Sequence, residues 1–149
     1  MADTSLSPLD RLIAESDCLK LINKFVLLSD ARDWDPLSDL FTEDGVFARP
    51  TDPANPIRGR EVIRAAYHAR PRGKLNRHFV ANAVVEVESA TTARGFSYVL
   101  LYLAPETDDG SASIADPLQL VGAFADTFEK VDGVWKIKER IGSLSIKTA

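Results

Sequence analysis

Asp30 and His78 are the two residues of this sequence whose types best suit general acid–base catalysis. Asp30 follows a helical stretch with a broad apolar face, where an unpaired carboxylate would be costly to bury. Histidine has an unperturbed pKa of about 6.5, so it can take up or release a proton near neutral pH. A carboxylate bonded to one ring nitrogen would fix the tautomer and leave the other nitrogen for a substrate. Such a pair suits the removal of a proton from a carbon beside a carbonyl group.

Each residue also has a purely structural interpretation. Asp30 alone could be a helix-end or turn residue, and His78 alone could be a hydrogen-bonded histidine at a strand edge. The other histidine, His68, lies near Arg70 and Arg72 at a helix end, where a positive charge is favourable. Two histidines without a convergent carboxylate motif predict no metal site. The acid–base chemistry described above also requires no cofactor.

The elements that must position these two residues fall into a helical half and a strand half. Segregated helices and strands indicate an α+β fold rather than alternating units. Ser7 and Pro8 are expected to begin the first helix, because serine caps well and proline fits the first turn. Between the two candidate residues we expect a helix over residues 35–41, a strand over 46–48, a proline-rich loop over 50–56 and a helix opening at 58–61.

The first long strand is expected to carry His78. Residues 78–88 alternate in character, so His78 and Asn82 should share the inward face of that strand. The opposite face would be too apolar for water, and we therefore expect a homo-oligomer, either a dimer or a trimer. That opposite face consists of Phe79, Ala81, Val85 and Val87.

Three more strands are expected to complete the sheet. Residues 96–103 are apolar and aromatic, which is typical of a strand buried on both faces. Residues 118–131 and 134–146 flank Asp132-Gly133, a strong signal for a hairpin turn. The four long strands would therefore form a mostly antiparallel sheet.

Composition excludes several classes of function. The chain has 149 residues and suits one domain spanning 1–149. Its net charge of −4 argues against a nucleic-acid surface and against binding to anionic membranes. No apolar run is long enough to cross a bilayer, and the first residues do not resemble a signal peptide, so we expect a cytoplasmic protein. The single cysteine, Cys18, is expected to be a small core residue.

Five short segments share an order and spacing typical of a known group of proteins. They are residues 30–37 with 40–47 at the junction of the first helix and first strand, 59–63 at the third helix, 77–79 at the first long strand and 130–137 at the last hairpin. Together they resemble the nuclear transport factor two-like superfamily, and within it the SnoaL-like and scytalone dehydratase-like enzymes. The resemblance covers residues 8–145. It implies a curved, mixed but mostly antiparallel sheet that forms a cone-shaped pocket with the N-terminal helices.

The resemblance also assigns a function to the pair. Asp30 and His78 match the aspartate and histidine that the dehydratases place inside the pocket. This implies a cofactor-independent dehydratase or isomerase acting on a cyclic hydroxy-ketone or on a polyketide- or steroid-like small molecule. Two other functions stay open: a binding protein that holds an apolar cyclic ligand without converting it, and a structural subunit like the small subunit of ring-hydroxylating dioxygenases.

The residue that holds the substrate oxygen is less defined. Scytalone dehydratase is similar but uses two tyrosines, where this chain has Ser29 and Arg49. In related bile-acid dehydratases an arginine of the last strand joins the pair, and Arg140 matches its place. The candidate oxygen-binding residues are therefore Tyr98, Tyr102, Arg140 and Arg49. The full set of expected substrate-binding residues is Phe25, Trp34, Phe47, Arg49, Tyr67, Asn82, Tyr98, Tyr102, Phe124 and Arg140.

Overall fold

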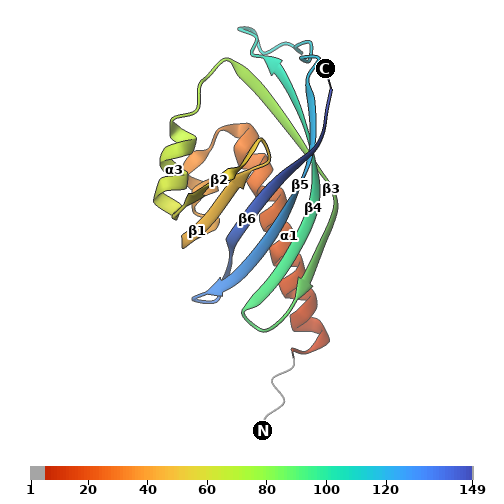
Figure 1. The fold of residues 1–149 in the computed structure, drawn as a ribbon. Helices are drawn as coiled ribbons and strands as arrows, with labels where there is room; N and C mark the ends of the chain where they lie inside the picture. The colour runs from red at the N-terminus through yellow and green to blue at the C-terminus, as the bar shows by residue number, and fades with distance from the viewer. Residues whose placement is uncertain (1–5, 149) are drawn as a thin grey trace.

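The computed structural model describes residues 6–148 and shows a long helix lying across one curved sheet (Figure 1). The strands follow the order β2-β1-β6-β5-β4-β3, with β1 parallel to β6 and all other neighbours antiparallel. The expected α+β fold, with its mostly antiparallel curved sheet, is confirmed. The elements are α1 (Pro8–Ala31), α2 (Trp34–Ser38), β1 (Phe41–Arg49), β2 (Asp52–Arg58), α3 (Arg60–His68), β3 (Lys74–Val87), β4 (Thr92–Pro105), β5 (Gln119–Val131) and β6 (Val134–Lys147).

Helix α1 begins and ends through local contacts. The Ser7 hydroxyl accepts the backbone N–H of Asp10 at 3.1 Å, and Pro8 is the first helical residue, as expected. At the other end Arg32 adopts a left-handed conformation with φ of 57° and stops the helix. Within residues 6–148, no helix combines the length and apolar character needed to cross a membrane. The buried face of α1 consists of Ala14, Cys18, Leu21, Ile22, Phe25, Val26 and Ser29.

Cys18 lies in the centre of this buried face and has no exposed surface. Burial, with a smaller contribution from the charge of Asp17, raises the pKa of its thiol to about 12. At pH 8 only about one thiol in 10⁴ would be the reactive thiolate. We therefore expect iodoacetamide to leave Cys18 unmodified in the native protein and to alkylate it after unfolding in urea, as mass spectrometry would show. Rapid modification of the folded protein would contradict this burial.

Two segments before α3 differ from the sequence-based expectation. Helix α2 begins at Trp34 and ends at Ser38, so it is shorter than residues 35–41, and Phe41 already belongs to β1. The proline-rich segment expected to be an irregular loop forms β2, which pairs with β1 in an antiparallel hairpin. Because β2 is an edge strand, one of its two sides has no partner strand. A proline, which lacks a backbone N–H, is tolerated there because the missing donor can face the unpaired side.

A β-bulge in β3 reverses the expected alternation of that strand. The register with β4 shifts between Ala81 and Val84, and Asn82 has φ of 53°. His78 faces inward as expected, but Val85 and Val87 also face inward and are buried. The expectation that Val85 and Val87 lie on the outer face was therefore wrong. The bulge adds one residue to the strand, so the side chains that follow it point to the opposite face from the one that strict alternation predicts.

The outer face of the sheet carries large apolar side chains in the open. Phe79, Val84, Phe96 and Tyr98 are all exposed, and the last two are 44% exposed. The expectation that residues 96–103 are buried on both faces was wrong for β4, since only one face packs on α1 and the core. An exposed apolar face of this kind favours a homo-oligomer, which stays a prediction.

Candidate active site

Asp30 at the end of α1 contacts His78 near the start of β3 through two bonds. The Oδ1 atom of Asp30 lies 2.5 Å from Nδ1 of His78, and Oδ2 accepts the backbone N–H of His78 at 2.9 Å. The two side chains are only 13% and 17% exposed, respectively. The contact fixes the imidazole ring and directs Nδ1 to the carboxylate, which leaves Nε2 as the ring nitrogen available to a ligand.

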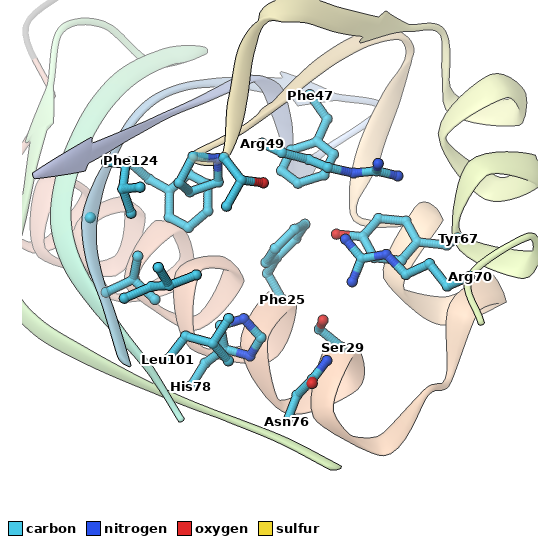
Figure 2. A pocket seen from close by; sticks show the side chains of 16 residues that line it. Phe25, Ser29, Phe47, Arg49, Tyr67, Arg70, Asn76, His78, Leu101 and Phe124 are labelled. Atoms are coloured by element: carbon cyan, nitrogen blue, oxygen red, sulfur yellow. The ribbon is translucent and has the colours of Figure 1, made fainter. Parts of the chain in front are cut away.

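His78 also lines a cavity of about 110 Å³ between α1, α3 and the sheet. Figure 2 shows Phe25 at its centre, with Phe47, Phe124 and Tyr67 around it. The ring centroids of Phe25 and Phe47 are 5.3 Å apart, and those of Phe47 and Tyr67 are 5.8 Å apart in a stacked arrangement. Four aromatic rings therefore form part of the wall, together with aliphatic side chains of β4, β5 and β6, while the ring of His78 supplies a polar group.

Six of the expected site residues line this cavity, and Trp34 lies just behind it. Trp34 is buried and packs on Tyr67 with ring centroids 5.1 Å apart, so it supports the wall from outside. The tyrosine ring is fully buried, which raises the pKa of Tyr67 to about 12 against the opposing charges of Arg70, Arg140 and Arg49. Tyr67 therefore stays a neutral hydrogen-bond donor. The cavity-lining residues from the sequence analysis are Phe25, Phe47, Arg49, Tyr67, His78 and Phe124.

Three expected binding residues point away from the cavity, in addition to the two that lie behind its wall. Asn82 is exposed in the bulge of β3, because the bulge turns it away from the face of His78. Tyr98 packs on Phe96, and Tyr102 packs on the outer face of β3, so neither hydroxyl can reach a ligand in the cavity. Successive side chains of a strand point to opposite faces of the sheet. Val99 and Leu101 of β4 point inward and line the cavity, so the neighbouring tyrosines point outward.

Arg140 lies behind the aromatic wall rather than in the cavity. It is completely buried, and its Nη1 donates to Oδ2 of Asp126 at 2.7 Å. Its guanidinium lies 4.5 Å from the ring centroid of Phe25 and 3.9 Å from that of Phe124. Burial raises the pKa of Asp126, and the charge of Arg140 opposes this shift. Arg140 therefore supports two rings of the wall, and its position does not fit the expected contact with substrate oxygen.

Four polar residues of the cavity were not predicted from the sequence: Ser29, Thr51, Arg70 and Asn76. Thr51 lies in the segment expected to be a proline-rich loop, whereas the other three had a signal in their spacing. Ser29 directly precedes Asp30, Asn76 lies two residues before His78 on the same face of β3, and Arg70 follows Tyr67 by three residues. Arg70 was set aside as part of a basic helix end, and Asn76 was missed because β3 begins at Lys74, before the expected start.

The turn that carries Arg49 is seated on two glycines of the sheet. A Cβ atom added to Gly142 would lie 2.5 Å from the backbone nitrogen of Pro50, and one added to Gly122 would lie 2.4 Å from the carbonyl oxygen of Ser143. Both glycines are therefore required for close approach of neighbouring backbone.

Gly142→Ala is expected to lower the free energy of unfolding by about 1–3 kcal/mol, because the added methyl group overlaps the ring of Pro50. A urea titration followed by circular dichroism would measure this change. Gly133→Ala serves as a control for the effect of adding Cβ alone, since no atom lies within 4 Å of its added Cβ and its cost would come only from its φ of 80°. Equal stability of Gly142→Ala and the wild type would contradict the close packing.

Among residues 6–148, no cluster of three histidine, cysteine, aspartate or glutamate side chains could hold a metal ion. The cavity offers a ligand the imidazole of His78, several hydrogen-bonding side chains and the positive charge of Arg49 and Arg70.

The fold is similar to several solved structures. A provisionally named scytalone dehydratase from Novosphingobium aromaticivorans has a TM-score of 0.80 and 22% identity, covering 95% of this chain and 91% of that chain. A type 2 hexachlorocyclohexane dehydrochlorinase, LinA, has a TM-score of 0.79 and 22% identity, covering 95% and 92%. A protein of unknown function from Mycobacterium tuberculosis has a TM-score of 0.75 and 27% identity, covering 95% and 78%.

No protein with a curated function matches the sequence significantly. The model of the SnoaL-like domain family matches residues 10–141, which is most of the chain. The fold, the order of the motifs and this match agree, and the protein belongs to the SnoaL-like domain family.

Proposed function

We propose that this protein is a cofactor-independent lyase or isomerase that moves a proton on a cyclic carbonyl compound. The observation that carries the proposal is the two-point contact between Asp30 and His78 at the wall of the cavity. A histidine oriented by a carboxylate, with one ring nitrogen left for a ligand, is an arrangement suited to general acid–base catalysis.

The proposed reaction begins when Nε2 of His78 removes the proton from the carbon beside the carbonyl group. The carboxylate of Asp30 stabilises the imidazolium that forms. In a hydroxy-ketone with the hydroxyl on the next carbon, the imidazolium then returns the proton to the departing hydroxyl, and water leaves with formation of a conjugated double bond. In a ketone that carries a β,γ double bond instead of the hydroxyl, the imidazolium returns the proton to the γ-carbon, and the double bond moves into conjugation with the carbonyl group.

The enolate oxygen formed in this step requires a hydrogen-bond donor. We assign this role to Tyr67, whose hydroxyl oxygen points into the cavity (Figure 2). Its pKa of about 12 keeps it protonated across the physiological range. This replaces Tyr98 and Tyr102, which lie on the outer face.

The comparisons support the reaction class. The names of two structural neighbours denote the loss of water and the loss of hydrogen chloride, and both reactions are eliminations. This proposal adopts only that shared class. The cavity volume of about 110 Å³ approaches that of a cavity of roughly 150 Å³ known to admit benzene. It therefore favours a ligand with one ring over the polyketide- or steroid-sized ligand that the family resemblance implies.

Exchange of hydrogen for deuterium tests the proposal. The protein would be incubated in D₂O with cyclohexanone and 3-hydroxycyclohexanone, each with and without a ring carboxylate. Nuclear magnetic resonance would follow loss of the hydrogens beside the carbonyl group, and ultraviolet absorbance would follow formation of the enone. We expect catalysed exchange in at least one compound. Binding of these compounds without any exchange would instead indicate a binding protein.

A further inference from the structure

Arg49 and Arg70 bring two positive charges to the same cavity. Arg49 comes from the end of β1, and Arg70 follows α3, so distant parts of the chain converge there. Figure 2 shows both guanidinium groups near Tyr67, on the other side of Phe25 from His78. The ion pairs within the described part of the chain include neither arginine.

These charges are costly in their surroundings. Burial lowers the pKa of Arg70, and repulsion from Arg49 and Arg32 adds to the effect, while Tyr67 opposes it. The Nε atom of Arg49 is buried and has no hydrogen-bond partner within residues 6–148. The guanidinium of Arg70 lies 4.2 Å from the ring centroid of Tyr67, which offsets part of the cost. Two like charges that lack an acidic partner would be relieved by an anion between them.

The backbone next to each arginine is anchored by contacts with other parts of the fold. The Nη2 atom of Arg32 donates to the carbonyl oxygen of Pro71 at 2.8 Å, which ties the segment of Arg70 to the end of α1. Arg49 precedes Pro50, whose ring is packed against Gly142. A pair of cations on anchored backbone is a preorganised site rather than two mobile surface side chains.

We infer that Arg49 and Arg70 bind a carboxylate, so that the substrate is a single-ring carboxylic acid with its reacting carbon turned toward His78. A carboxylate matches the planar donor pattern of guanidinium groups. It also occupies less of the 110 Å³ cavity than a phosphate or sulfonate would. The assignment of a reacting carbon rests on the proposed function, whereas the assignment of a carboxylate rests on the two arginines alone.

Calorimetric titration with benzoate and benzamide tests the site, because the two compounds have nearly the same shape and differ in charge. At pH 7 we expect benzoate to bind about tenfold or more tightly than benzamide. Arg49→Gln and Arg70→Gln should each lower the affinity for benzoate about fivefold or more and leave benzamide unchanged. Arg77→Gln is the matched control: it removes a positive charge next to His78 from an exposed side chain outside the cavity and should preserve the preference.

Equal affinity for the two compounds, or no binding of benzoate at millimolar concentration, would overturn the carboxylate site. A benzoate preference that stays at the wild-type value in both arginine variants would overturn it as well. His78→Ala separates this inference from the proposed reaction, because it should lower exchange by about 10²-fold or more while the preference for benzoate persists. A wild-type protein that prefers benzoate and catalyses no exchange would support the carboxylate site and remove the proposed chemistry.

Discussion

His78→Ala is expected to lower exchange of the hydrogen beside the carbonyl group by about 10²- to 10⁴-fold, the usual contribution of a general base. Among the described residues that line the cavity, only His78 has an imidazole ring. One of its nitrogens contacts the carboxylate of Asp30, and the other can take the proton. The cavity itself should survive, since its aromatic wall comes from other residues. Binding of benzoate to the variant would show that the pocket remains intact.

Asp30→Asn is expected to produce a loss of similar order, about 10²-fold or more, through the orientation of His78. The carboxylate accepts both the backbone N–H and the Nδ1–H of His78, whereas an amide has only one oxygen to accept with. The variant should therefore bind ligands but hold the ring in the wrong tautomer.

The chain offers a matched control for each of these variants. His68→Ala removes the other histidine, which is exposed and pairs with Asp35 on the surface. Asp33→Asn removes an exposed carboxylate three residues from Asp30. Both should retain the wild-type exchange rate. Near-wild-type exchange in His78→Ala or Asp30→Asn would refute the proposed acid–base pair, provided that circular dichroism shows the same fold.

Asp126→Ala is expected to lower the free energy of unfolding by about 3–5 kcal/mol, because it leaves the charge of Arg140 buried without a counterion. Both side chains of the pair are fully buried, and the register of β5 with β6 places them directly opposite each other. The guanidinium also supports the rings of Phe25 and Phe124. Disturbing the pair should therefore loosen one side of the cavity.

Replacing both members of the pair should reverse most of this loss. Asp126→Leu combined with Arg140→Met removes the charges together and fills the space with apolar atoms, which is often neutral or stabilising for buried ion pairs. Urea denaturation would measure the single variants and the double variant. Additive losses in the double variant would show that the two residues act independently, against the direct contact at 2.7 Å.

Much of the fold could be predicted from the sequence, because local contacts set many of its boundaries. Ser7 and Pro8 begin α1, and Asp132 and Gly133, with φ of 50° and 80°, form the turn between β5 and β6. The errors fell where a neighbouring strand decides the conformation. Prolines that suggest a loop are accommodated in β2 because it lies at the edge of the sheet.

The residues of the candidate site also fall into those that the sequence could identify and those whose position depends on the tertiary structure. Asp30 and His78 could be singled out from their chemical types and from a family resemblance. Tyr98 and Tyr102 could not be assigned correctly, because their direction depends on which face of β4 packs on the core. Arg70 was missed because a basic residue after a helix has the same sequence pattern whether it points into solvent or into a cavity.

The sequence by itself therefore determined the residue types capable of proton transfer, the ends of the long helix and the last hairpin. These depend on contacts between residues a few positions apart, which any local segment contains. Only the tertiary structure decided that Asn82 turns outward at a bulge, that Arg140 lies behind the wall and that Arg49 and Arg70 share a cavity. Register, burial and the meeting of distant charges arise from packing between strands and helices, which no short segment specifies.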